Sequence, residues 1–316
     1  KVTSVLILIA VILSTAATTA MGQSIGILQA MRADQAAGLN GDRYATFHQL
    51  SEAQQKALLS DSRLEDPGCW IFLGSVSLEN SSLTLFLREY HENGLQAYPS
   101  IGTLKEGRLP EKAGEIALSE DALRYLGFDL HSEDSSGIRL GDTVTLPVNV
   151  SLKKDTQPPY EYTADFVLSG ILEDHYIGYM SGSIGGVVGW GTAAELLPER
   201  YFLYSADFKT KSTDQFQSIV WDLSEKLHVP EDDVQYNWIL LDALGIPYEG
   251  KSDAETGSGF PFMAAACVLV GGLILLAAGL VIYNILKVAV TKRIHEYGTL
   301  RAIGSEQKQL YLLVTV

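Results

Sequence analysis

The uncharged stretch FPFMAAACVLVGGLILLAAGLVIYNIL, residues 260–286, decides the class of protein to which this chain belongs. About 20 helical residues, at a rise of about 1.5 Å each, cross the ~30 Å apolar core of a bilayer. A second block without charge covers residues 2–31. The sequence therefore predicts two transmembrane helices, at residues 1–24 and 259–286, on either side of a large polar segment.

The first block has an alternative interpretation as a cleavable signal peptide. Lys1 would be its charged start, residues 5–13 its apolar core and the small residues 14–20 its cleavage site. However, the uncharged stretch is longer than the usual apolar core of about 7 to 15 residues, and no hydrophilic start appears before Arg32. A membrane span is the favoured interpretation.

The basic residues near the spans predict the orientation of the chain, because basic loops stay in the cytoplasm. They follow the second span closely, as Lys287, Lys292, Arg293, Arg301 and Lys308. Residues 32–259 are then extracytoplasmic. Of the 38 acidic and 23 basic residues, all but two acids and six bases lie in this segment, which gives it a formal charge of −19. Such a charge excludes nucleic acid as a natural partner.

Two similar strand–helix–strand units lie in the outer segment, within residues 25–103 and 196–258. The first has a strand at 44–50, a helix whose capping box is Ser51 and Gln54, and strands at 69–78 and 83–90. The second has strands at 201–209 and 234–241 around an amphipathic helix, with apolar residues Phe216, Ile219, Val220, Leu223 and Leu227. Together they predict an α+β layer domain.

Residues 104–195 between these units predict a separate, inserted β-rich subdomain. Residues 114–127 indicate a strand and a short helix that Ser119 caps and Gly127 ends. Apolar and polar residues alternate at 141–150 and 160–172, as in half-buried strands. The glycine-rich stretch 178–191 lacks the spacing of a phosphate-binding loop, and we expect a surface loop or a bulged hairpin there.

No catalytic constellation is apparent in the sequence, so an enzyme is not predicted and no cofactor or metal is implied. Neither Ser181 nor Ser183 lies in a G-x-S-x-G motif. The only two cysteines are Cys69 in the outer segment and Cys267 within the second span, so they are not expected to form a disulfide. Cys69 is expected to be a buried apolar residue. The lack of disulfides favours a bacterial surface.

The segment after the second span, residues 287–309, has helical periodicity. Val290, Ile294, Tyr297, Leu300 and Ile303 share one face. One interpretation is a helix that lies among lipid headgroups. Residue 304, a glycine, marks a stop, and the apolar residues 310–316 are expected to begin a third span.

This segment resembles the FtsX-like permeases of the MacB type, which are membrane subunits of ABC transporters. The family motif E-x-G-x-L-R-A-x-G is matched by Glu296, Gly298, Leu300, Arg301, Ala302, Ile303 and Gly304. Residues 104–127 and the sequence LGDTVTL resemble the periplasmic core of the family. The resemblance implies an extracytoplasmic α+β domain with porter-like repeats and an inserted β-rich subdomain, flanked by transmembrane helices. It also implies a multi-pass protein of the bacterial cell membrane.

The resemblance further implies a permease that transmits ATP-driven motion, for export, extraction or control of an extracellular partner. A cytoplasmic ABC ATPase is the expected partner, because the chain has no Walker motif. The expected ATPase-coupling residues are Ile294, Glu296, Tyr297, Gly298, Leu300, Arg301, Ala302, Ile303 and Gly304. Small residues in the second span, Gly271, Gly272, Ala278 and Gly279, are expected to let a second permease copy or a paralogue approach.

A second class of function stays open at the level of sequence. The chain could be a membrane-anchored sensor or binding module, whose outer domain binds an extracellular protein, peptide or lipid. Its inner segment would then be an anchor in contact with the bilayer, since amphipathic helices of this kind lie in the interface. Small residues are also common in spans that face only lipid. Further spans and an ATPase partner would distinguish the permease from the sensor.

Overall fold

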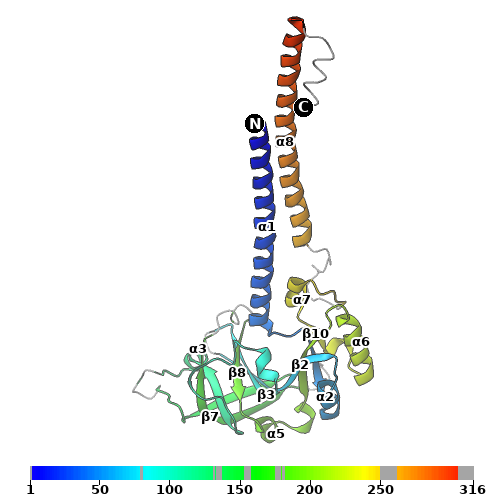
Figure 1. Ribbon diagram of the computed structural model, residues 1–316. Coiled ribbons are helices and arrows are strands. Elements are labelled where there is room, and N and C mark those ends of the chain that lie inside the picture. The colour runs from blue at the N-terminus through cyan, green and yellow to red at the C-terminus, as the bar shows by residue number, and fades with distance from the viewer. Residues whose placement is uncertain are drawn as a thin grey trace. The chain divides into compact units, whose positions relative to one another are not determined.

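The computed structural model describes residues 2–78, 81–130, 132, 137–152, 158–174, 179, 182–249 and 262–304 (Figure 1). The chain divides into two compact units. One unit comprises Lys1–Gln29 and Ser258–Val316, and the other comprises Ala30–Gly257. The first contains long apolar helices and the second contains the sheet, so each is described by itself.

Two long helices contain most of the predicted spans, 1–24 and 259–286; residues 1 and 259–261 lie outside the described part of the chain. Helix α1 is Val2–Asn40 and helix α8 is Phe262–Ala302. By length and composition, Val11–Asn40 and Val268–Ala302 could each cross a membrane. Helix α8 has no internal proline, and it continues without a break from the apolar stretch into the predicted coupling segment. Gly304 follows its end with a φ of 106°, which fits the predicted stop.

The second unit is built on one sheet of ten strands among the described residues. Their bounds are β1 Ala45–Leu50, β2 Leu64–Ser77, β3 Thr84–Glu92, β4 Leu104–Gly107, β5 Glu115–Ser119, β6 Thr143–Val150, β7 Tyr160–Leu172, β8 Ser183–Val188, β9 Tyr204–Thr210 and β10 Val234–Tyr236. The strand order is β10-β1-β9-β2-β3-β8-β5-β7-β4. Strand β6 pairs with both β7 and β2, so six of the strands close into a ring.

Short helices cover the sheet and connect its strands. Their bounds are α2 Glu52–Leu59, η1 Gly94–Ala97, α3 Glu120–Tyr125, α5 Thr192–Leu196, η2 Glu199–Tyr201, α6 Phe216–Leu227, η3 Glu231–Asp233 and α7 Trp238–Leu244. The predicted capping box at the start of α2 is present, because Ser51 and Gln54 each bond the backbone of the other. Ser119 caps α3 as predicted.

Two large apolar cores lie among the described residues of this unit, and Ala117, Leu172 and Val187 form a third, smaller cluster. The first fills the ring of strands, where alternate residues of β6 point inward: Val144, Leu146, Val148 and Val150. The second lies between the sheet and helices α2 and α6. All five apolar residues predicted for α6 are buried in it, together with Phe47 and Phe208, whose rings meet edge to face. The predicted α+β fold class with flanking apolar helices is therefore confirmed.

The two predicted parts of the outer domain share the same sheet. Strand β2 pairs with β9 along its first half and with β3 along most of its length, and its Ser75 also meets Asn149 of β6. A single long strand thus contributes to both cores. The exact subdomain boundaries, at residues 104 and 195, stay a prediction.

Residues 183–188 of the glycine-rich stretch do not form the surface loop or bulged hairpin that the sequence predicts for 178–191; residues 178, 180 and 181 lie outside the described part of the chain. Residues 183–188 form β8, which lies between β3 and β5 in the interior of the sheet. A Cβ atom at Gly186 would lie 2.9 Å from side-chain atoms of Leu87 and Leu118, and one at Gly189 would lie 1.9 Å from the Lys112 carbonyl oxygen. Glycine is required here because neighbouring groups approach the backbone closely.

The predicted strand at 234–241 is also wrong in its second half. Strand β10 ends at Tyr236, and Trp238 begins helix α7. Leu240 and Leu241 are buried on one side of this helix, whereas Trp238 is 42% exposed. A short apolar run is compatible with either a buried strand or a buried helix turn, so the pattern alone did not distinguish them.

Candidate functional site

The predicted coupling residues lie at the C-terminal end of helix α8. Residues 294–302 belong to its last turns, and Ile303 and Gly304 follow directly. The apolar side chains Ile294 and Ile303 are 64% and 80% exposed. Exposed apolar side chains on a helix end provide a surface that a partner can cover. The role of these residues stays a prediction.

The predicted helix-packing residues lie further toward the N-terminus of the same helix. A Cβ atom added to Gly271, Gly272 or Gly279 would meet nothing within 4 Å. At about 100° per residue, these glycines and Ala278 fall within roughly 120° of the helix surface. The contacts of the described chain therefore do not explain why these positions are small, and their proposed partner remains a prediction.

A buried ion pair that the sequence did not reveal joins the end of α1 to the sheet. Arg43 follows α1 closely, and its Nε lies 3.1 Å from Oδ1 of Asp207 on β9. The two side chains are only 7% and 1% exposed. Because isolated charges are very costly away from water, each side chain depends on its partner.

Asp207 receives further hydrogen bonds within this cluster. Thr46 Oγ1 donates to Oδ1 at 2.5 Å, and Trp70 Nε1 donates to Oδ2 at 2.7 Å. These bonds and the ion pair engage both oxygens of the carboxylate. Three strands therefore meet at Asp207, because Thr46 lies on β1 and Trp70 on β2.

A second guanidinium lies near the same carboxylate. The Arg88 guanidinium carbon is 4.3 Å from the centre of the Trp70 ring and 5.4 Å from that of Tyr98. The Tyr98 hydroxyl accepts a hydrogen bond from Arg43 Nε at 3.1 Å. Burial raises the pKa of Tyr98 above its usual range, so this hydroxyl remains protonated at neutral pH. The cation–π contacts with these two rings stabilise the Arg88 guanidinium in its buried position.

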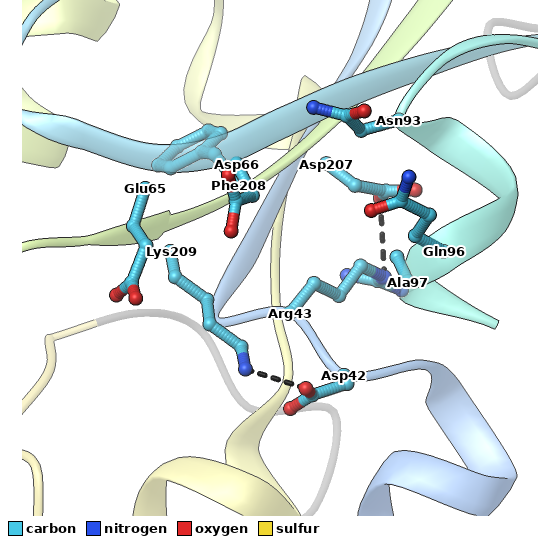
Figure 2. Close-up of a pocket in the computed structure, with 10 residues that line it drawn as sticks. All are labelled: Asp42, Arg43, Glu65, Asp66, Asn93, Gln96, Ala97, Asp207, Phe208 and Lys209. Atoms are coloured by element: carbon cyan, nitrogen blue, oxygen red, sulfur yellow. Dashed lines mark ion pairs between the residues drawn. The ribbon is translucent and has the colours of Figure 1, made fainter. Parts of the chain in front are cut away.

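A pocket of about 170 Å³ opens beside this cluster (Figure 2). We call it the Arg43 pocket. Its lining residues are Asp42, Arg43, Glu65, Asp66, Asn93, Gln96, Ala97, Asp207, Phe208 and Lys209. A second ion pair spans it, with Lys209 Nζ 2.6 Å from Asp42 Oδ2. In the view of Figure 2, Arg43 and Asp207 lie on one side and Glu65 and Asp66 on the other. This arrangement can bind polar groups.

Sequence reasoning could not have found this pocket. Arg43 and Asp207 are more than 160 positions apart, and no motif links them. The alternation in strand β9 marks Ala206 and Phe208 as core residues, yet Ser205 and Asp207 on the opposite face are buried as well. Only a strand covered on both faces explains that pattern.

The C-terminal part of the chain matches a known protein family. Residues 268–315 match the family described as FtsX-like permease C-terminal. No curated protein matches the chain.

Two solved structures are similar to part of the chain. The periplasmic region of MacB from Actinobacillus actinomycetemcomitans is 14% identical, with a TM-score of 0.38, and the match covers 66% of this chain and 95% of that chain. The extracellular domain of the noncanonic ABC-type transporter YknZ from Gram-positive bacteria is 11% identical, with a TM-score of 0.37. That match covers 61% of this chain and 98% of the other.

Proposed function

We propose that this chain, which is an FtsX-like permease by its residues 268–315, transmits ATP-driven motion from a cytoplasmic ABC ATPase to its outer domain. It would act as a non-catalytic membrane subunit, with ATP hydrolysis in the partner. The observation that carries this proposal is the continuity of helix α8, from the apolar window to the coupling motif. A force on one end of an unbroken helix is passed to the other end.

The coupling surface of the proposal is the C-terminal end of α8. Ile294, Tyr297 and Leu300 would fill an apolar groove of the ATPase, together with Ile303. Glu296 and Arg301 would make polar contacts at its rim, because charged groups at the edge of an interface fix its register. The small residues Gly298, Ala302 and Gly304 would allow close approach.

The basic residues near this end of α8 support its placement in the cytoplasm. The domain Ala30–Gly257 would then lie outside a bacterial cell membrane, in a protein with further spans. Gly271, Gly272, Ala278 and Gly279 would face a second permease copy or a paralogue, since small residues permit close helix packing in lipid. Export or extraction of a peptide or lipid, and control of an extracellular protein, are the outputs that this design allows.

Co-purification with the ATPase tests the proposal. Leu300→Asp places a charge in the apolar coupling surface, and we expect it to abolish capture of the ATPase from native membranes. The matched control is His295→Asp, which introduces the same side chain about 140° away around the helix. It should retain the ATPase. Limited proteolysis of the outer domain should be the same for both variants.

Three results would contradict the proposal. Full retention of the ATPase by Leu300→Asp would remove the coupling role from this surface. Labelling of a cysteine placed at residue 301 by an impermeant reagent on intact cells would put the segment outside. If no ATPase accompanies even the unmodified chain, the membrane-anchored sensor becomes the better description.

A further inference from the structure

The C-terminal part of helix α8 has a second surface besides the one proposed to contact the ATPase. We call it the basic face, and its residues, all exposed, are Asn284, Lys287, Val288, Thr291 and Lys292. At about 100° per residue, they fall within about 140° of the helix circumference. The centre of this arc lies about 150° from Tyr297 and from Leu300, so the two surfaces point in different directions.

The basic face begins where the apolar segment ends. Lys287 is the first charged residue after the uncharged stretch 260–286. As a helix, this stretch is about 40 Å long, which exceeds the ~30 Å apolar core of a bilayer. In a membrane, Lys287 therefore lies at the depth of the lipid headgroups, and long lysine side chains extend toward them.

The charge of this segment is positive and uncompensated. No acidic residue lies between Glu255 and Glu296 in the sequence. Lys287 and Lys292 form no ion pair with any residue that the structure describes, and this includes Glu296, which follows Lys292 by about one turn. Such a surface favours an anion, because opposite charges attract across an interface.

The hydrogen-bond donors of the basic face match a phosphate group. Thr291 Oγ1 donates to the Lys287 carbonyl oxygen at 2.8 Å, so its only proton is used within the helix. The remaining side-chain donors are the ammonium groups of the two lysines and the amide of Asn284. Phosphate oxygens accept strong bonds from ammonium groups, and lysine binds phosphate as a point charge.

The same side of α8 continues into an apolar surface within the span. Leu273 and Leu280 fall within the same arc and are 58% and 54% exposed. The small residues proposed to face another permease copy lie on the opposite side of the helix. An occupant of the basic face can therefore also contact apolar side chains. A ligand with a charged head and apolar chains uses both surfaces, whereas a soluble phosphate uses only one.

We propose that the basic face binds the phosphate of an anionic phospholipid. Lys287 and Lys292 flank the phosphate, Asn284 donates to it from the membrane side, and the acyl chains run along Leu280 and Leu273. A zwitterionic phospholipid carries its own ammonium group, which offsets its phosphate and weakens the attraction. The site leaves the coupling surface uncovered and does not depend on an ATPase.

Native mass spectrometry of the delipidated full chain tests the proposal. The probes are dioleoylphosphatidylglycerol and dioleoylphosphatidylcholine, which share their acyl chains and differ in headgroup charge. One basic residue near a membrane surface strengthens the attraction to anionic lipid about fivefold. We therefore expect the first phosphatidylglycerol to bind at least fivefold more tightly than the first phosphatidylcholine. Equal affinities would overturn the proposal.

Variants locate the lipid on the basic face. Lys287→Gln with Lys292→Gln removes both of its cations, and the preference for phosphatidylglycerol should fall to less than twofold. Arg293→Gln with Arg301→Gln is the matched control, because it removes two cations of the same helix that lie outside the arc. It should keep the preference. An equal loss in both pairs would indicate general attraction to the basic segment and would overturn the site.

Two further measurements separate charge from folding and lipid from soluble phosphate. Lys287→Arg with Lys292→Arg retains both charges and should retain the preference, while circular dichroism should give the same helix content for all variants. Glycerol phosphate has the charged group without acyl chains, and an excess of it should not displace phosphatidylglycerol. Complete displacement would show that the face binds a soluble phosphate and would overturn the assignment to lipid.

Discussion

The side chain of Asn237 donates a hydrogen bond from Nδ2 to the carbonyl oxygen of Gly41 at 2.8 Å. Gly41 follows helix α1, and Asn237 directly precedes helix α7. The Asn237 backbone N–H also donates to the Tyr44 carbonyl at 2.9 Å. A single buried residue, 1% exposed, therefore holds the start of α7 against the segment that leaves α1.

Replacing this residue should destabilise the outer domain. Asn237→Ala leaves the Gly41 carbonyl without its side-chain donor, and we expect a loss of about 1–3 kcal/mol in the free energy of unfolding. Urea unfolding followed by tryptophan fluorescence measures it. Asn149→Ala is a suitable comparison, because Asn149 bonds an exposed Glu161 side chain. It should cost about 1 kcal/mol or less.

Asp207→Asn should have a larger effect. The amide removes the only carboxylate that Arg43 contacts among the described residues, and Arg88 lies close by. Breaking a buried pair by changing one partner costs about 3–5 kcal/mol. The emission of Trp70 should also change, since its ring nitrogen donates to Asp207. A variant as stable as the parent would show that the cluster does not need this charge.

The stability of the outer domain should depend on Glu115 in acid. A bidentate ion pair with Arg108 lowers the pKa of Glu115 to about 2, from an ordinary value of 4.5. Between these values the unfolded chain binds more protons than the folded one, so stability falls as the pH falls through this window. The stabilising contribution of the Glu115–Arg108 ion pair is fully present above this pH window. Glu115→Gln should flatten the dependence of unfolding free energy on pH between about 4.5 and 2.

The comparison for this experiment is Glu111→Gln, since the Glu111 backbone N–H donates to Glu115 but its carboxylate is not part of the pair. That variant should keep the full slope. A slope that Glu115→Gln leaves unchanged would assign the acid sensitivity to other carboxylates, such as Asp61, whose pKa is also lowered to about 2 by Arg63.

Cys69 should resist alkylation in the folded protein. The residue is fully buried, and burial raises the pKa of its thiol to about 11, so the reactive thiolate is scarce at neutral pH. In a Cys267→Ser background, iodoacetamide should label Cys69 only after urea is added. Mass spectrometry of the peptide measures the extent. Rapid labelling without urea would show that the strand opens locally.

Sequence patterns correctly predicted those elements whose signals come from residues close together in the sequence. Three features can be recognised from nearby residues alone: the capping box at Ser51, the apolar face of α6, and the alternation of apolar and polar residues in β6. They were correct for that reason. The prediction that Cys69 is a buried apolar residue is also confirmed.

Features that depend on distant neighbours were missed. By composition, Gly186 of β8 and Gly189 just after it would be expected in a loop. The close approach of Leu118 to Gly186 and of Lys112 to Gly189 explains why glycine stands at these positions. Asp207 is an ordinary polar residue of a strand until Arg43 and Trp70 are placed beside it. The coupling and helix-packing residues stay predictions, because their partners lie outside the chain.

At the two ends of its strand order this sheet has only short edges. The strands that pair on one side only are β10, of three residues, and β4, of four, in the part of the chain that the structure describes. Short edges offer few unpaired backbone groups to a neighbouring molecule. Copies of this domain therefore have little opportunity to join strand to strand at these two ends of the sheet.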